Sequence, residues 1–89
     1  MIVTVAKVTE LDRFLEIFRT LGADKRREHG CRSARVYIDP GDAQRVWSIF
    51  DWDDKDYAGF LADPEIPAIA RPLGLQDPPV HADAAIEAD

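Results

Sequence analysis

The sequence predicts an α+β domain of the ferredoxin-like class, ordered strand–helix–strand–strand–helix–strand. Three observations lead to this prediction: short segments rich in β-branched residues, a long apolar stripe at helical spacing, and the turn sequence Asp-Pro-Gly-Asp at residues 39–42. The length of 89 residues fits a single domain over residues 1–89. We therefore expect a four-stranded antiparallel sheet with its helices on one face.

The first strand and the first helix are expected at the start of the chain. Residues 2–7, IVTVAK, are mostly β-branched and too few for a stable helix, which indicates a strand. Thr9 to Asp12 resembles a capping box, and a helical stripe follows at Leu11, Phe14, Leu15, Phe18 and Leu21. The helix should run from about Glu10 to Glu28, loosened at Gly22. Its last turns carry Lys25, Arg26 and Arg27, which suit the helix dipole, and Gly30 is its expected C′ residue.

Two further strands, a second helix and a last strand complete the pattern. Residues 32–38 and 45–52 are expected to form an antiparallel hairpin around the 39–42 turn. Asp53 should cap a helix through Tyr57, Phe60 and Leu61, and Asp63-Pro64 should start a helical turn over residues 65–71. A loop with Pro72, Gly74, Pro78 and Pro79 leads to a last strand over residues 80–86.

Both faces of the likely central strands are apolar, which predicts an assembly. In the third strand Val46, Ser48, Phe50 and Trp52 share one face and Trp47 and Ile49 the other, while Val3 and Val5 oppose Ile2, Thr4 and Ala6 in the first. A sheet with helices on one face should otherwise alternate apolar and polar residues. We expect a symmetric homodimer, with the open sheet faces against each other.

Composition narrows the classes of function. The net charge of −6 argues against non-specific binding to nucleic acid or to an anionic membrane. No apolar run is long enough for a membrane helix, and the start of the chain lacks the features of a signal peptide, so a cytoplasmic protein is expected. The single cysteine, Cys31, excludes an intramolecular disulfide and has no CxxC partner for zinc. No metal or cofactor is expected.

The stretch VWSIFDWDDKDYAGFLADPEI, residues 46–66, combines a strand ending in an aromatic–acidic–Trp run with a helix and an Asp-Pro pair. In this feature, and over nearly the whole chain, the sequence resembles the dimeric α/β-barrel superfamily, which includes antibiotic biosynthesis monooxygenase-like proteins. The resemblance implies a homodimer and, in each subunit, a cavity between sheet and helices. It also implies that cofactor-independent oxygenation of aromatic compounds is among the possible activities.

Two departures from this superfamily restrict the function. Haem-degrading members resemble one another in an Asn–Trp–His set, whereas this sequence has no asparagine and no histidine in the second helix, although Trp52 matches the tryptophan. Haem degradation is therefore not expected. Many similar proteins carry a histidine just before Lys-Val in the first strand, and here that position is Ala6.

The candidate ligand-binding residues are Trp52, Phe50, Ser48, Phe14, Phe18 and Tyr57. The two phenylalanines of the helix stripe must face the sheet, and Ser48, Phe50 and Trp52 share one strand face. The resemblance places Trp52 at the cavity, where its indole would stack on a flat ligand, and Tyr57 would offer a phenol. The alternatives are that Trp52 packs the core, that Tyr57 is a surface residue, and that the phenylalanines fill the space completely.

Other clusters have simpler interpretations. His81 and Asp83 lie two apart on the last strand, where they could orient a proton-transfer site or form a solvated edge. His29 is expected to be a polar residue near a helix end. The acids at positions 51, 53, 54 and 56 lack the glycine and glutamate positions of an EF-hand loop.

The sequence thus predicts a homodimer that binds a small aromatic or hydrophobic molecule, and it leaves open whether the protein is an enzyme. A cofactor-independent monooxygenase-like enzyme is one form of this prediction. The alternative is a non-enzymatic binding or interaction module with a vestigial pocket.

Overall fold

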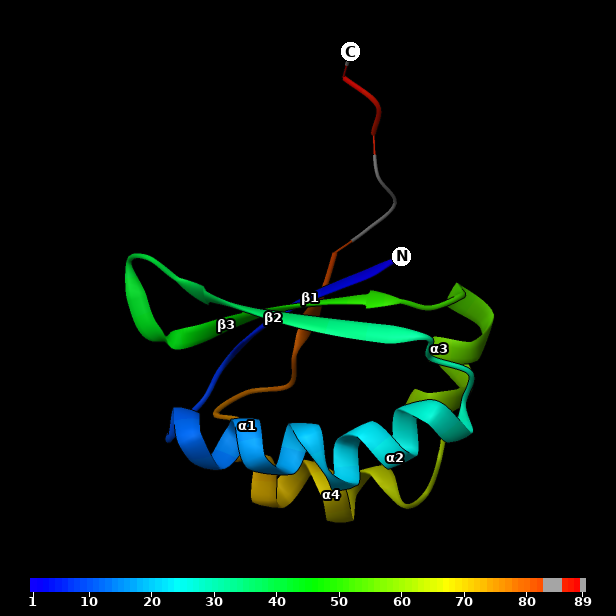
Figure 1. The fold of residues 1–89 in the computed structure, drawn as a ribbon, viewed down its shortest axis with the longest axis horizontal. Coiled ribbons are helices and arrows are strands. Elements are labelled where there is room, and N and C mark those ends of the chain that lie inside the picture. Colours follow the sequence, from blue (N-terminus) through cyan, green and yellow to red (C-terminus); the bar gives the residue numbers. More distant parts are fainter. Residues whose placement is uncertain (83–85, 89) are drawn as a thin grey trace.

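In the computed structural model, which describes residues 1–82 and 86–88, a four-stranded sheet forms one layer and the helices form a second layer beneath it (Figure 1). All strand pairs are antiparallel, in the order β2-β3-β1-β4. This arrangement confirms the predicted ferredoxin-like α+β class. The elements are β1 (Ile2–Lys7), α1 (Leu11–Arg19), α2 (Leu21–Glu28), β2 (Ser33–Asp39), β3 (Asp42–Asp51), α3 (Asp54–Leu61), α4 (Ile66–Leu73) and β4 (Val80–His81).

The predicted hairpin between β2 and β3 is confirmed, and its strands reach closer to the turn than expected. Asp39 pairs directly with Asp42, so β3 begins at Asp42 instead of Arg45. The Asp39 carboxylate accepts the backbone N–H of Gly41 at 2.8 Å, which closes the turn locally.

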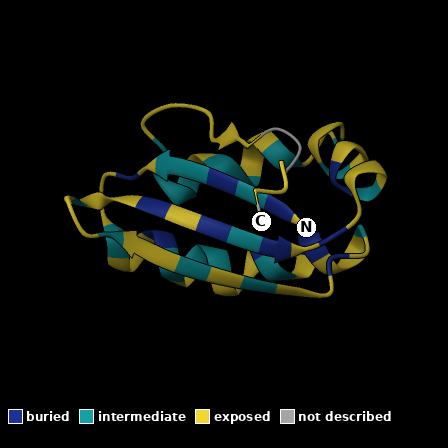
Figure 2. Cartoon of the chain, turned by 90° about the horizontal axis from the view of Figure 1, so that it is seen from above, coloured by how far each residue is buried: buried dark blue, intermediate teal, exposed yellow. Residues whose placement is uncertain are grey.

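The helices cover the face of β3 that carries Val46, Ser48 and Phe50, and these residues are buried, as is Trp52 directly after the strand. Trp47 lies on the other face and is 39% exposed. Seen from above, β3 alternates between buried and more exposed residues from Val46 to its end (Figure 2). The prediction that the face with Ser48, Phe50 and Trp52 lies under the helices is therefore confirmed.

The single long helix expected over residues 10–28 is wrong, because the chain divides it into α1 and α2 at Thr20. Thr20 has φ −112° and ψ −94°, outside the helical region. Its hydroxyl donates to the Glu16 carbonyl oxygen at 2.8 Å and its N–H to that of Ile17 at 3.2 Å. These local bonds compete with the continuing helix. The break lies two residues before the predicted weak point at Gly22.

Gly30 is the C′ residue of α2, as predicted, with φ +82°. The N–H of Gly30 bonds the Arg27 carbonyl oxygen and the N–H of Cys31 bonds that of Arg26, at 3.1 and 3.0 Å. This pattern is a Schellman motif, which satisfies carbonyl groups that the end of a helix leaves free.

The predicted side-chain caps at the starts of α1 and α3 do not form. Glu10, and not Thr9, occupies the N-cap of α1, and the Thr9 hydroxyl donates to the Gly74 carbonyl oxygen at 3.2 Å. Asp53 occupies the N-cap of α3 without a side-chain cap bond, because its carboxylate accepts from Arg32 at 3.2 Å. Asp63 does bond the Glu65 N–H, at 2.9 Å, before α4.

The last part of the chain differs from prediction in two places. α4 extends to Leu73, so Pro72 lies inside it, where a loop was expected, and Gly74 ends the helix at φ +71°. Pro72 has no N–H to donate to the Ala68 carbonyl oxygen, so the last turn of α4 lacks one helical hydrogen bond. β4 is confined to Val80 and His81, whereas the predicted strand continued through residues 83–85, which lie outside the described residues. No described helix is long and apolar enough to span a bilayer.

Candidate ligand-binding cavity

The floor of the candidate site is a cross-strand pair of small hydroxyl residues on the inner face of the sheet. Thr4 of β1 pairs with Ser48 of β3, between the larger pairs Ile2 with Phe50 and Ala6 with Val46. Thr4 and Ser48 are buried, at 7% and 4% exposure. Neither side chain forms a hydrogen bond to another described residue. The short side chains leave room between the sheet and the helices at this point.

The walls and roof come from all four helices. Phe14 and Phe18 of α1 lie side by side, with ring centroids 5.3 Å apart. The apolar stripe of α4, with Ile66, Ile69 and Leu73, lines the space from another side. None of the α4 residues is fully buried, because the stripe borders a hollow instead of a closely packed core.

Together these elements enclose a cavity of about 150 Å³. Its lining is mostly apolar, and its polar groups are the hydroxyls of Thr4, Ser48 and Tyr57 and the guanidinium of Arg26. The remaining lining residues are Ala6, Phe14, Phe18, Gly22, Val46, Phe50, Phe60, Leu61, Ile66, Ile69, Ala70, Leu73, Leu75 and Pro79.

Five of the six candidate residues from the sequence line this cavity: Phe14, Phe18, Ser48, Phe50 and Tyr57. The phenylalanines do not fill the space between sheet and helices. Whether the five residues bind a ligand remains a prediction.

Trp52, the sixth candidate residue, lies outside the cavity lining. It is 1% exposed, and its indole N–H donates to the His29 carbonyl oxygen at 2.8 Å. Its ring contacts Tyr57 and Phe60 edge to face, with centroids 5.3 and 4.9 Å away. In this position Trp52 supports the wall formed by Tyr57 and Phe60, and its N–H is already satisfied.

Arg26 is the cavity residue that sequence reasoning missed, because it was assigned to the helix dipole. It is 8% exposed, and its Nη2 donates to the Phe18 carbonyl oxygen at 3.0 Å. Its guanidinium carbon lies 3.9 Å from the centroid of the Phe18 ring, a cation–π contact. The sequence does contain a pattern that places Arg26 on the side facing the sheet, because Phe18, Gly22 and Arg26 continue the apolar stripe at intervals of four.

The model of the antibiotic biosynthesis monooxygenase family matches residues 2–69. The chain belongs to this family. A comparison with curated proteins gave no match.

Solved structures share the fold of this family member. A conserved protein from Methanosarcina mazei Go1 is 16% identical, with a TM-score of 0.68, over 91% of this chain and 85% of that one. An antibiotic biosynthesis monooxygenase is 15% identical, with a TM-score of 0.56, over 97% of this chain and 100% of that one. At these identities the likeness concerns the fold alone.

Burial affects the titratable groups around the cavity of this family member. It raises the pKa of the Tyr57 phenol and of the Cys31 thiol. Desolvation lowers the pKa of Arg26, although a guanidinium starts so high that it stays charged at neutral pH. Near pH 7 the phenol and the thiol are therefore neutral and Arg26 is positive.

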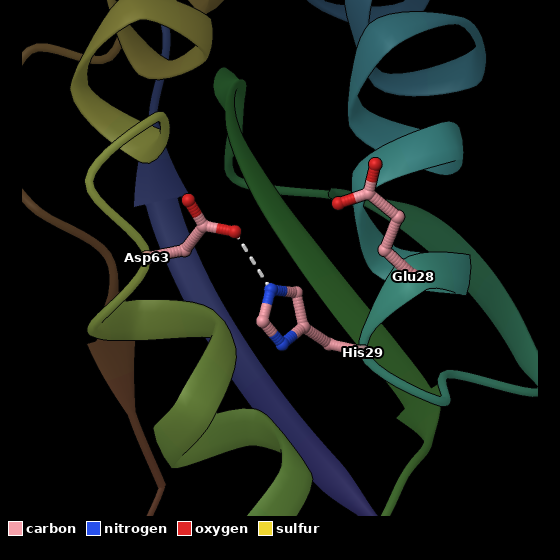
Figure 3. Close-up of side chains that lie close together, drawn as sticks. All are labelled: Glu28, His29 and Asp63. Atoms are coloured by element: carbon pink, nitrogen blue, oxygen red, sulfur yellow. Dashed lines mark hydrogen bonds and ion pairs between the residues drawn. The ribbon is translucent and has the colours of Figure 1, made fainter.

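A second polar cluster lies outside the cavity, where α2 ends beside the loop before α4. Glu28, His29 and Asp63 each offer a potential metal ligand within 4.8 Å of the others (Figure 3). The Lys25 ammonium already lies 2.9 Å from a carboxylate oxygen of Glu28 and 2.9 Å from one of Asp63. Hydrogen bonds to these two carboxylates raise the pKa of Lys25. A metal ion would have to displace this charged group, so we describe the cluster as an ion-pair network.

The remaining sequence candidates are placed as follows. The His81 ring lies edge to face against Tyr57, with centroids 5.0 Å apart, beside the cavity and not in its lining. Asp83, its proposed partner, lies outside the described residues. Asp51 and Asp53 both accept hydrogen bonds from Arg32 at 2.9 and 3.2 Å, which engages them in ion pairs.

Proposed function

We propose that this member of the antibiotic biosynthesis monooxygenase family is a homodimer that binds a small aromatic molecule in the cavity between its sheet and its helices. The observation that supports the proposal is the apolar cavity with hydroxyl groups at Thr4, Ser48 and Tyr57. A largely apolar space with a few converging polar groups is the usual form of a small-molecule site.

The size of the cavity narrows the ligand. A cavity of about 150 Å³ accommodates roughly one benzene ring without rearrangement. A flat polycyclic compound would require movement of side chains such as Leu61 and Leu73 at the helix side. A single-ring ligand is therefore the simplest occupant.

The proposal is tested by thermal shift with a panel of single-ring aromatic compounds, comparing the wild type with Ser48→Leu. A ligand that binds the folded protein raises its melting temperature by mass action. The larger side chain at Ser48 should occupy the cavity and abolish the shift. Ser33→Leu, on the exposed part of β2, is the matched control and should respond like the wild type. No response to any compound in the wild type would contradict the proposal.

A monooxygenase-like activity is the catalytic form of this proposal, and family membership supports it. None of the described lining residues has a carboxylate or an imidazole that could remove a proton from a substrate. A substrate that is already electron-rich would therefore be required. Oxygen consumption with each compound that binds tests this form, and binding without consumption would favour a non-enzymatic binding module.

The proposed dimer is supported by a row of apolar side chains across the uncovered face of the sheet. Register pairs join Tyr37 to Trp47, Trp47 to Val5, and Val5 to Val80. Tyr37, Trp47 and Val80 are 49%, 39% and 65% exposed. The helices α1, α2 and α4 lie on the other side of the sheet (Figure 1), so a second copy is the partner that this family's architecture suggests.

A further inference from the structure

The helix α2 contains two neighbouring buried cations, and they differ in whether a carboxylate pairs with them. Lys25 has two carboxylate partners at 2.9 Å, from Glu28 and Asp63. Arg26 has no carboxylate within ion-pair distance among the described residues. A buried charge is costly unless it is paired and hydrogen-bonded. Arg26 is therefore a charge for which the described chain supplies no counter-ion.

The groups that the Arg26 guanidinium contacts directly are neutral. One of its five N–H donors bonds the Phe18 carbonyl oxygen, and its flat face lies on the Phe18 ring. Cys31 also lies beside it, and burial raises the pKa of that thiol, so it carries no charge near pH 7. Most of the directional hydrogen-bonding capacity of the guanidinium is thus left for another partner.

The guanidinium is also placed where a ligand could reach it. Arg26 lines the 150 Å³ cavity, and it lines a neighbouring groove of about 450 Å³ between α1, α2 and β2. A Cβ atom at Gly22 would come within 3.1 Å of Arg26 Nη1, so the glycine keeps that side of the guanidinium clear. Arg19, in the same groove, adds a second cation to its rim. Two cations that line one groove favour an anion there even in a chain of net charge −6.

We propose that Arg26 is an anion-binding residue of the cavity and that the ligand is a single-ring aromatic carboxylate. Its ring would lie among the apolar lining and its carboxylate would accept two parallel hydrogen bonds from Arg26, the geometry that a guanidinium favours. The inference rests on the proposed function, because it assumes that the cavity is occupied, and it specifies the charge of the occupant.

A matched pair of probes tests the charge. Sodium benzoate and benzamide have the same ring and nearly the same shape, and they differ in charge. At equal ionic strength, benzoate should bind the wild type about tenfold or more tightly than benzamide, the value of a charge-assisted hydrogen bond. Arg26→Met should remove this preference and leave the affinity for benzamide within about twofold, because the ring site is retained. Arg27→Met, at the exposed neighbouring cation, should bind benzoate like the wild type.

A measurement on the wild type covers the case in which Arg26→Met does not fold. In protein labelled with ¹⁵N at arginine, benzoate should shift the side-chain Nε–H resonance of Arg26, assigned by its loss in Arg26→Lys, and benzamide should not. Equal affinity for the two probes, or unchanged benzoate binding in Arg26→Met, would overturn this inference while leaving the proposed function intact. If neither probe binds the wild type, this inference fails, and the thermal-shift panel of single-ring compounds decides the proposed function separately.

Discussion

At the scale of single residues, Asp63 bonds to three residues, of which two lie near the end of α2 and one lies just before α4. One of its oxygens lies 2.8 Å from His29 Nε2 and 2.9 Å from Lys25 Nζ, and the other accepts the Glu65 N–H at 2.9 Å. The hydrogen bond from His29, followed by those from Glu65 and Lys25, holds the pKa of Asp63 well below its usual range. The ionised carboxylate thus stabilises the link between α2 and the loop before α4.

A depressed pKa in the folded state gives a definite dependence on pH. The stabilisation is fully present above the unfolded pKa of about 4 and is lost as the pH falls below it. Asp63→Asn should therefore lower the melting temperature by several degrees at neutral pH and flatten its decline between about pH 4 and pH 2. Circular dichroism melts over this range measure both effects. Asp77→Asn, in an exposed loop, is the control, and parallel curves for wild type and Asp63→Asn would contradict the prediction.

Residue-level prediction from the sequence succeeded where side-chain periodicity decides the position. The period of two placed Ser48 and Phe50 on the covered face, and the helical stripe placed Phe14 and Phe18 opposite them. Sequence reasoning did not identify Arg26 as a cavity residue, because the helix dipole already explains a basic residue near the end of a helix. It also left open whether Trp52 stacks on a ligand or packs in the core, because only the tertiary structure shows that its N–H reaches the His29 carbonyl oxygen.

At the scale of elements, a glycine at the end of α2 and a glycine inside α3 have opposite expected responses to the same substitution. Gly30 has φ +82° at the C′ position of α2, and a Cβ atom there would lie 3.0 Å from Asp56 Oδ2. Gly59 lies inside α3, where a Cβ atom would meet only His29 Nδ1 at 3.8 Å, an ordinary contact.

Gly30→Ala should therefore destabilise the protein by about 1–2 kcal/mol, the cost of a left-handed conformation for a residue with a Cβ atom. Gly59→Ala should stabilise it by about 0.5–1 kcal/mol, because alanine has the higher helix propensity. Urea denaturation of the two variants and the wild type gives both differences. Changes of the same sign would show that the local backbone does not control the response.

The elements differ in how well the sequence determined them. The hairpin was predictable because Asp-Pro-Gly-Asp combines turn geometry with a side-chain bond at Asp39. The break at Thr20 was not, because the apolar stripe continues through it and the competing bond is made by one hydroxyl. The α4 helix was predicted too short because Pro72 suggests a loop, yet the helix continues through Pro72 to Leu73 without the backbone hydrogen bond that a proline cannot donate.

At the scale of the whole molecule, the two faces of the sheet have different roles. The covered face forms the cavity floor, where the small Thr4–Ser48 pair leaves space. The uncovered face carries an apolar row from Tyr37 to Val80 with no helix over it. Sequence periodicity predicted both faces, but it could not predict the size of the cavity, because that depends on where α4 lies relative to α1.

The uncovered face provides the last prediction. Ile49 is half-buried within one chain and pairs with Val3 on the same face, next to Trp47. If two copies join through this face, Ile49→Asp places an unpaired carboxylate inside an apolar interface, where removing it from water is costly. The variant should be a monomer or an aggregate at micromolar concentration, whereas the wild type should sediment as a dimer.

Ala68→Asp, on the exposed side of α4, adds the same charge on the helical layer and should leave the dimer intact. Because Ile49 is not part of the cavity lining, a folded monomeric Ile49→Asp variant should still bind the cavity ligand. Sedimentation velocity distinguishes the assemblies. A wild-type monomer at micromolar concentration would refute the dimer, and equal dissociation in Ile49→Asp and Ala68→Asp would show that the partner binds through a surface other than the open face of the sheet.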